Sequence, residues 1–204
     1  MTENESARPT IEVLPATAKR WTDLERLFGA NGAYSNCWCM FWRMTHTDFN
    51  RMKAAERKTR LQLLTLGARP PGVIAYVDGT PAGWCSLGPR EDYIALERSR
   101  NLRRVDDRPV WSVVCFFVAK PYRRQGLALA LLKGAVGYAA AQGAKIVEAY
   151  PLDLQTPRLQ GAHLTGTSGY MGIASVFREA GFSEAARTSE TQVIMRYYVA
   201  EAGG

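Results

Sequence analysis

Residues 110–128 read VWSVVCFFVAKPYRRQGLA, and this segment indicates the fold more clearly than any other part of the chain. Its first nine residues are the most apolar segment of the chain, which is typical of a central strand covered on both faces. Pro121 breaks the strand, and residues 125–142, rich in Leu and Ala, predict a helix that stops at Gly143. A strand that leads through a short basic turn into a helix presents unpaired backbone N–H groups at the positive end of the helix dipole. The stretch therefore predicts an anion-binding turn.

The composition of this turn suits a diphosphate. Gly126 and the small Ala128 let a diphosphate approach the backbone closely, while Arg123 and Arg124 add positive charge around it. The glycine patterns of a P-loop and of a dinucleotide-binding turn are both missing. The alternative is a plain strand-to-helix turn with solvated arginines.

Strand and helix patterns alternate on both sides of this stretch. Strands are expected at residues 10–14, 72–77, 81–87, 110–118, 145–150, 182–187 and 192–199. Helices are expected up to Gly29, from Thr47 or Asp48 to Gly67, over 125–142 and over 170–180, with a short helix plus loop in 91–108. We find no internal repeat and no linker, so we expect one mixed α/β domain over 10–199, between a flexible N-terminus (1–9) and a C-terminal tail (200–204).

Composition and charge narrow the class of protein. The 204 residues are 47% hydrophobic and 22% charged, which excludes a disordered, collagen-like or plain coiled-coil chain. We see neither a signal peptide nor a membrane-length apolar run, so we expect a cytoplasmic protein with reduced cysteines and no membrane partner. The net charge is +7, from an excess of +4 in residues 1–70, +3 in 71–130 and 0 in 131–204. Such a basic field favours an anionic partner without saying which.

On these residues the sequence resembles the GNAT superfamily of N-acetyltransferases, whose signature is an apolar strand followed by Arg/Gln-x-x-Gly-x-Gly/Ala. Arg123, Gly126 and Ala128 match it, and Ala180-Gly181-Phe182 looks like the family's helix-to-strand exit. The order of elements also matches over nearly all of residues 10–199. The resemblance implies a twisted mixed sheet of about seven strands, split between strands 4 and 5 and flanked by about four helices.

The same resemblance implies acetyl-CoA or another acyl-CoA as cosubstrate, with its pantetheine arm in the split of the sheet. The backbone of Phe116, Phe117 and Val118 would hold pantetheine and the acyl carbonyl. Tyr170 falls where the family often has an asparagine touching the cofactor. The residues expected around the pyrophosphate are Arg123, Arg124, Gln125, Gly126, Leu127, Ala128 and Leu129.

Acyl transfer to an amine also needs a base for the ammonium proton and an acid for the leaving thiolate. Glu148 lies on the strand after the cofactor helix, where many GNAT enzymes have a catalytic Glu; the alternative is a surface-facing or edge-strand Glu. The family's usual tyrosine acid is replaced by Phe177. Tyr150 or Tyr170 could serve instead, or solvent could protonate the thiolate, or the donor is not a CoA thioester.

The resemblance places the acceptor pocket near the first two helices. Residues expected to shape it are Cys37, Trp38, Met40, Trp42, Trp84 and Ser86, although most of the aromatics could equally belong to the core. Cys37 and Cys39 with His46 suggest zinc, but a structural site needs four ligands and His163 is the only other histidine, so we expect no metal.

Basic residues concentrate in two segments, and the usual meaning of such runs is a solvated helix face. The alternative is a groove for a polyanion such as tRNA, since some GNAT-type enzymes act on aminoacyl-tRNA. The residues concerned are Arg51, Lys53, Arg57, Lys58 and Arg60, and then Arg98, Arg100, Arg103, Arg104 and Arg108.

Three functions follow from these patterns. The first is an acyl-CoA-dependent N-acyltransferase acting on a primary amine of a small molecule or peptide, and a homodimer would be usual for GNAT relatives. The second is a GNAT-fold enzyme that uses aminoacyl-tRNA as acyl donor or acceptor. The third is a non-catalytic module that senses CoA.

Overall fold

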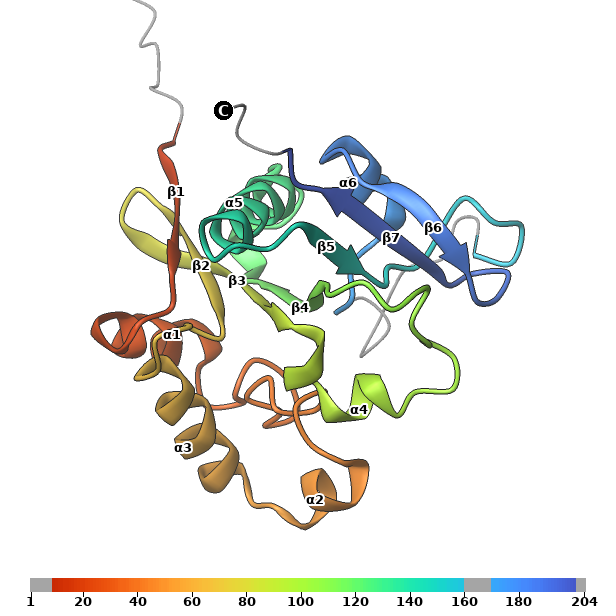
Figure 1. The fold of residues 1–204 in the computed structure, drawn as a ribbon. Coiled ribbons are helices and arrows are strands. Elements are labelled where there is room, and N and C mark those ends of the chain that lie inside the picture. The colour runs from red at the N-terminus through yellow and green to blue at the C-terminus, as the bar shows by residue number, and fades with distance from the viewer. Residues whose placement is uncertain (1–8, 160–169, 201–204) are drawn as a thin grey trace, which may run out of the picture.

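A computed structural model describes residues 9–159 and 170–200, and His163 lies outside them. The chain forms one seven-stranded sheet in the order β1-β2-β3-β4-β5-β7-β6 (Figure 1). The strands are β1 (Ile11–Pro15), β2 (Gly72–Val77), β3 (Thr80–Pro89), β4 (Trp111–Val118), β5 (Ile146–Ala149), β6 (Ser183–Arg187) and β7 (Val193–Tyr198). The helices are α1 (Trp21–Phe28), α2 (His46–Arg51), α3 (Ala54–Thr65), α4 (Ile94–Glu97), α5 (Leu127–Ala141) and α6 (Ala174–Glu179). Every expected strand is present within two residues of its expected bounds, and the mixed α/β fold is confirmed.

The sheet opens between β4 and β5. These two strands run parallel but pair over only three positions, the last of which joins Val113 to Ala149. The register against β3 shifts just there, because Ser86 pairs with Cys115 whereas Leu87 pairs with Val113. Val114 is therefore the extra residue of a β-bulge, which bends β4 away from β5. The first four residues of β4 are buried and the last four only half-buried, so the far half of β4 has an open edge.

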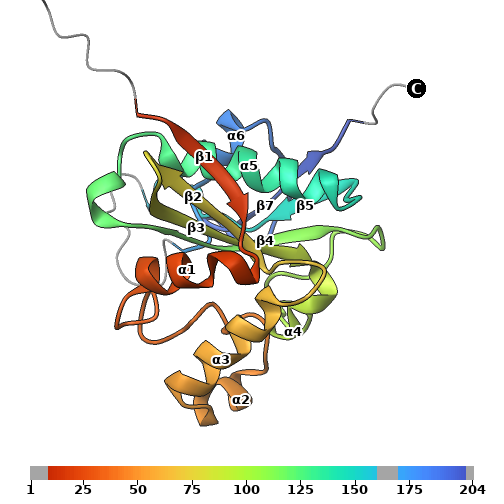
Figure 2. The same cartoon turned by 90° about the vertical axis from the view of Figure 1, so that its left-hand side faces the viewer.

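Helices cover both faces of the sheet (Figure 2). On one face α5 and α6 pack on a core that includes Val113, Val147 and Phe177. Gly134 lets α5 approach β1 closely, because a Cβ there would lie 2.5 Å from the Val13 side chain. On the other face α1 and α3 pack against β2, β3 and the end of β4. The burial of these apolar surfaces is the main source of the fold's stability.

The helix expected from Thr47 or Asp48 to Gly67 is broken into α2 and α3. Thr45 caps α2, since its hydroxyl accepts a hydrogen bond from the Asp48 amide. Met52 and Lys53 are then extended, and the Glu56 carboxylate accepts a 2.7 Å hydrogen bond from the Lys53 amide to start α3. The side-chain hydrogen bond of Glu56 to the Lys53 amide thus accompanies the start of a new helix after the extended residues. The spacing of the apolar residues gives no sign of this break.

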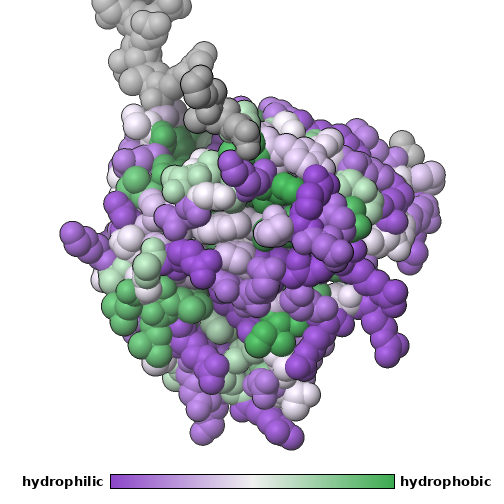
Figure 3. Space-filling model, in the orientation of Figure 1, coloured by the Kyte–Doolittle hydropathy of each residue, from purple (hydrophilic) through white to green (hydrophobic). Residues whose placement is uncertain are grey.

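No helix in the described part of the chain is long and apolar enough to cross a membrane. Figure 3 shows a mostly polar face with some apolar surface on its α1–α3 side. Leu63 in α3 and Leu66 just after it are 59% and 65% exposed.

Asp153 fastens the second half of the sheet to the helix beside it. Its carboxylate accepts hydrogen bonds at 2.9 Å from Arg178 in α6 and from Arg187 in β6, although its side chain is only 6% exposed. The hydrogen bonds from Arg178, and after them those from Arg187, lower the pKa of Asp153 to about 2. A carboxylate with a lowered folded-state pKa stabilises the fold above its unfolded pKa, near 3.9, and ceases to do so below its folded one.

We therefore expect Asp153→Asn to lower the free energy of unfolding by about 2 kcal/mol at pH 7. The difference from the wild type should shrink as the pH falls from about 4 towards 2, because the wild-type carboxyl then becomes protonated. Urea unfolding at a series of pH values measures it. The exposed Asp107→Asn is the control and should show little change. If the free energy of unfolding of D153N stayed below that of the wild type by the same amount down to pH 2, the lowered pKa of Asp153 would not be the source of its contribution.

Candidate functional site

The turn after β4 has the geometry of an anion site. A 3-10 turn (Lys120–Tyr122) follows the strand, after which Arg124 and Gly126 adopt left-handed backbone angles, with φ of +61° and +76°. The first helical hydrogen bonds of α5 are those of the Leu129 and Ala130 amides, which both donate to the Gly126 carbonyl. The preceding amides therefore have no carbonyl one turn back to bind. They lie at the positive end of a 15-residue helix, where an anion is favoured.

The surroundings of the turn leave room for a ligand. A Cβ on Gly126 would meet no atom within 4 Å, so the space beside this backbone is open. Residues 123–126 are exposed. Two of them fix the turn in place, because Arg123 Nε donates to the Val118 carbonyl at 2.8 Å and Gln125 Nε2 donates to the Pro121 carbonyl at 2.7 Å. The turn is thus held to the end of β4, and the space beside Gly126 stays open.

Tyr170 lies against the open edge of β4. Its carbonyl accepts a 2.6 Å hydrogen bond from the Phe116 amide, and its ring packs on Tyr34 with centroids 5.2 Å apart. Burial, followed by the nearby Cys115, raises the pKa of Tyr170 to about 12. The hydroxyl is therefore protonated at neutral pH, beside the half of β4 that β5 leaves unpaired.

Glu148 lies in the interior of the sheet, between two buried arginines. It faces Arg196 directly across the antiparallel β5–β7 pair, and its Oε2 accepts from Arg196 Nε at 2.8 Å. Its Oε1 accepts from Arg90 Nη1 at 2.9 Å. All three side chains are 1% exposed. The carboxylate is thus neither surface-facing nor on an edge strand, and both of its oxygens are bonded.

Tyr150 belongs to the same buried cluster. Its hydroxyl donates to Glu148 at 2.7 Å, accepts from Arg90 at 2.8 Å and lies 2.7 Å from the Ser112 hydroxyl. Burial, with Glu148 next, raises the pKa of Tyr150 well above its ordinary value. Because the residue is fully buried, its hydroxyl has protein partners rather than an opening to solvent.

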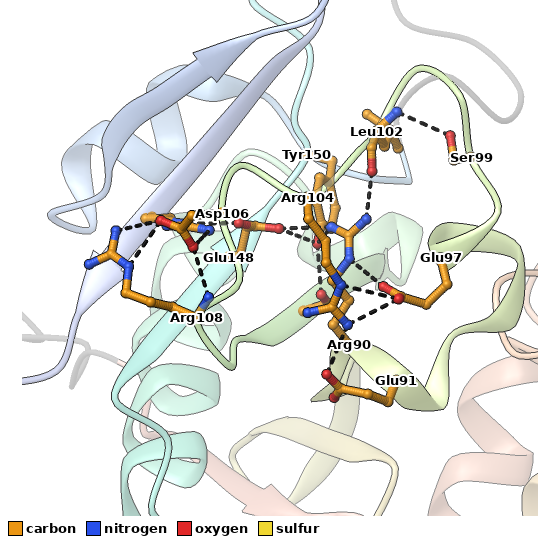
Figure 4. A network of polar contacts seen from close by, with 12 residues as sticks. Arg90, Glu91, Glu97, Ser99, Leu102, Arg104, Asp106, Arg108, Glu148 and Tyr150 are labelled. Atoms are coloured by element: carbon orange, nitrogen blue, oxygen red, sulfur yellow. Dashed lines mark hydrogen bonds and ion pairs between the residues drawn. The ribbon is translucent and has the colours of Figure 1, made fainter.

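The cluster extends into a network of ion pairs between β5, β7 and the 90–108 segment (Figure 4). Asp106 accepts from Arg196 at 2.7 Å and from Arg108 at 2.7 Å, and these bonds hold the pKa of Asp106 far below its usual range. Glu97 binds both Arg90 and Arg104. The network joins four arginines to four carboxylates, so its formal charges cancel: Arg90, Arg104, Arg108 and Arg196 with Glu91, Glu97, Asp106 and Glu148.

The sequence pointed to Glu148 but not to its partners. Arg196 interrupts an apolar strand pattern just as Glu148 does, and a pair of opposite charges on two buried strands was the available signal. Arg90 gave no such signal because it follows a strand in a polar stretch. The basic segment 91–108 also has fewer cations available to a partner than expected, since Arg104 and Arg108 form ion pairs inside the network.

The residues expected around the acceptor pocket are mostly core. Trp38 and Met40 are each 5% exposed, Trp84 and Ser86 are fully buried, and Trp42 is half-buried. Trp38 packs on Phe28 and also borders a cavity of about 340 Å³ between α1 and α3. That cavity is lined by Glu25, Gly29, Ala30, Asn36, Trp38, Ala54, Ala55 and Lys58, none of which belongs to β4 or to the turn.

The loop that carries these aromatics is strained. Five of its non-glycine residues have left-handed backbone angles, which L-amino acids rarely adopt. They are Ala33, Ser35, Asn36, Trp38 and Cys39. Such angles persist only where the surroundings impose them, and they gather at functional sites. Arg57 holds one carbonyl of this loop, because it donates a hydrogen bond to Asn36 as well as to Phe49 and Met52 at the end of α2.

The first basic segment is partly used within the protein as well. Besides Arg57, Lys58 is paired with Glu25. Arg51, Lys53, Arg60, Arg100 and Arg103 show no ion pair with another described residue. In the described ranges, no group of three or more His, Cys, Asp or Glu side chains could hold a metal ion. The tRNA partner stays a prediction, with fewer free cations than the sequence suggested.

Comparison with known proteins identifies the class. Residues 38–160 match the model of the acetyltransferase (GNAT) family, which is more than half of the chain. The protein therefore belongs to the GNAT acetyltransferases, and the resemblance noted in the sequence is confirmed. A search of curated protein sequences finds no match.

Solved structures share this fold at low sequence identity. A ribosomal-protein-alanine N-acetyltransferase from Brucella melitensis is 15% identical, with a TM-score of 0.51, over 92% of this chain and 99% of its own. An N-acetyltransferase from Staphylococcus aureus Mu50 is 10% identical, with a TM-score of 0.51, over 93% and 98%. The PaiA N-acetyltransferase from Thermoplasma acidophilum, solved in complex with coenzyme A, is 13% identical, with a TM-score of 0.50, over 93% and 99%. At this identity the similarity concerns the fold alone.

Proposed function

We propose that this GNAT protein transfers an acetyl or other small acyl group from acyl-CoA to a primary amine of a small molecule or peptide. The observation that carries the proposal is the turn of residues 123–128 at the end of β4, where the amides of residues 124–128 have no backbone partner in the described part of the chain and the space beside Gly126 is open. A pyrophosphate would be held there by backbone N–H groups, by the α5 dipole and by the charge of Arg124. These residues fit the group that the family uses.

The open half of β4 suits the pantetheine arm. Phe116, Phe117 and Val118 lie beyond the last pairing with β5, so their backbone borders the split. The Phe116 amide is bonded to the Tyr170 carbonyl. If acyl-CoA accepted a hydrogen bond from this amide, it would replace the Tyr170 carbonyl as the acceptor. The Tyr170 backbone would then have to shift.

Tyr170 is the hydroxyl best placed to assist the leaving thiolate. When the amine attacks the thioester carbonyl, the carbon–sulfur bond breaks and negative charge develops on sulfur. The Tyr170 hydroxyl is protonated, half-buried and near both Cys115 on β4 and Arg123 in the turn. Tyr150 is enclosed among Glu148, Arg90 and Ser112, so we assign it and Glu148 to holding the 90–108 segment in place.

Tyr170→Phe is expected to lower kcat for acyl transfer by about 100-fold, since removing one donor to a developing anion has effects of this size. The dissociation constant for acetyl-CoA should change little, because the backbone carbonyl of residue 170 is retained. Steady-state kinetics with the best acceptor measure the first quantity, and calorimetry measures the second. Tyr34→Phe, which removes the hydroxyl from the neighbouring ring, is the matched control. A Y170F enzyme with wild-type kcat would exclude this role.

Titration calorimetry with acetyl-CoA tests the proposed function itself. Saturable binding below millimolar ligand is expected, and absence of binding would refute the cofactor assignment. A panel of amines, with release of free CoA followed by chromatography, then separates an enzyme from a CoA-sensing module. Binding without CoA release for any amine would favour the module.

A further inference from the structure

Two cysteines from distant parts of the chain meet beside the split of the sheet. Cys39 lies in the strained loop between α1 and α2, and Cys115 lies on β4 directly after the bulge residue Val114. Their sulfur atoms are 3.7 Å apart, although 76 residues separate them. A disulfide needs a sulfur separation of about 2.05 Å, so closing the pair requires a small shift of one loop.

The two thiols differ in exposure and in hydrogen bonding. Cys39 is 6% exposed, whereas Cys115 is half-buried on the open half of β4. The Cys39 thiol donates its hydrogen to the Cys115 sulfur, and the Trp84 indole N–H donates to the Cys39 sulfur at 3.0 Å. The hydrogen bond to Cys115, and after it burial, raise the pKa of Cys39 well above its ordinary value. Cys39 therefore stays a thiol, and Cys115 is the sulfur that a small oxidant can reach.

The other two cysteines lack this combination. Burial, with Cys39 next, raises the pKa of Cys37 to about 11, so it too stays a thiol at neutral pH. Cys85 is fully buried on β3, and burial raises its pKa well above the ordinary value. Redox-sensing cysteines are accessible to solvent and often lie next to a resolving cysteine. Cys37 is half-buried as Cys115 is, but of the four cysteines only Cys39 and Cys115 have their sulfur atoms in contact, at 3.7 Å.

We infer that Cys115 and Cys39 form a peroxide-oxidisable dithiol, in which Cys115 reacts first and Cys39 resolves. The Cys115 thiolate attacks one oxygen of a hydroperoxide, the O–O bond breaks, and a sulfenic acid forms while hydroxide leaves. The Cys39 sulfur then attacks the oxidised sulfur while its thiol proton passes to the departing hydroxide; the S–O bond breaks, water leaves, and the disulfide forms. With hydrogen peroxide the balance is two thiols and one peroxide to one disulfide and two waters. The product ties the loop to β4, and its formation does not depend on the proposed acyl transfer.

The test uses the full-length reduced protein, treated with a small excess of hydrogen peroxide, alkylated and mapped by mass spectrometry without reduction. We expect the loss of two hydrogen atoms from the intact mass, one cross-linked peptide pair that contains Cys39 and Cys115, and full reversal by dithiothreitol. A link that involves Cys37 or Cys85 instead would overturn the inference. So would four unmodified thiols at a peroxide dose that oxidises free glutathione.

Variants then identify the order of the two steps. In Cys39→Ser, Cys115 should accumulate as a sulfenic acid that dimedone traps, because the resolving thiol is gone. In Cys115→Ser, Cys39 should resist oxidation, and Cys37→Ser should behave as wild type. A dimedone adduct on Cys39 in C115S, at the rate seen for Cys115 in C39S, would contradict the order. Because the wild-type map needs no variant, poor folding of either serine variant leaves the inference testable.

Discussion

Gly126→Trp is expected to abolish measurable binding of acetyl-CoA, with a loss of affinity of at least about 100-fold. Two charge-assisted hydrogen bonds of about 1.5 kcal/mol each would account for such a loss. The open space beside Gly126 is where a diphosphate would contact the amides, and the indole would fill it. The backbone also has a φ of +76°, which an L-residue adopts at a cost of roughly 1–2 kcal/mol. The substitution would thus strain the backbone of the turn and fill the space beside its amides.

Calorimetry on the folded variant measures this effect, and Gly137→Ala is the matched control. Gly137 lies inside α5, the helix that begins directly after Gly126; a Cβ there would also meet no atom within 4 Å, but its backbone is helical. Alanine there should leave binding unchanged and stabilise the protein by about 0.5–1 kcal/mol. If G126W bound acetyl-CoA as tightly as the wild type, the pyrophosphate could not lie at this turn, and the proposed function would lose the observation that carries it.

Glu148→Ala is expected to destabilise the protein by about 3–5 kcal/mol, the effect of removing one partner from a buried ion pair. The variant leaves the guanidinium groups of Arg90 and Arg196 buried without the carboxylate that faces both. Arg196 would retain Asp106, and Arg90 would retain Glu97. Those partners are about one-third exposed, so they compensate only in part. Urea unfolding followed by circular dichroism measures the loss.

Two further variants make this result specific. Glu148→Gln keeps an oxygen acceptor but no charge, so its stability should fall between those of the wild type and E148A. The exposed Glu179→Ala on α6 should change stability by no more than about 0.5 kcal/mol. If E148A lowered the free energy of unfolding by less than E179A does, the network would not hold the sheet together. A folded E148Q with wild-type kcat would show in addition that Glu148 is not the base.

Much of the fold could be predicted because its signals are local. The run of residues 110–118 marks β4 by its composition alone, and the glycines at 126 and 143 mark the ends of α5 by the backbone angles they permit. Hydrophobic spacing does not indicate the break between α2 and α3, because that break is accompanied by polar contacts: Lys53 donates to Glu56, and Arg57 donates to the carbonyls of Phe49 and Met52. The sequence pattern predicts the start of α6 four residues early, because Gly172, with a φ of +84°, turns the chain before the helix begins.

The order of strands and helices and the turn at residues 123–128 can be read from the sequence, because each depends on residues that are neighbours in the chain, and the resemblance to the GNAT family adds the split of the sheet. The contacts of the polar and sulfur-bearing side chains, in contrast, follow from the three-dimensional packing. Glu148 meets Arg90 across 58 residues and Arg196 across 48, and Cys39 meets Cys115 across 76. The strand register and the bulge at Val114 determine which of these side chains meet and how far apart their atoms lie. The free energy of a buried charge or of a thiol pair depends on those distances, and no local pattern in the chain encodes them.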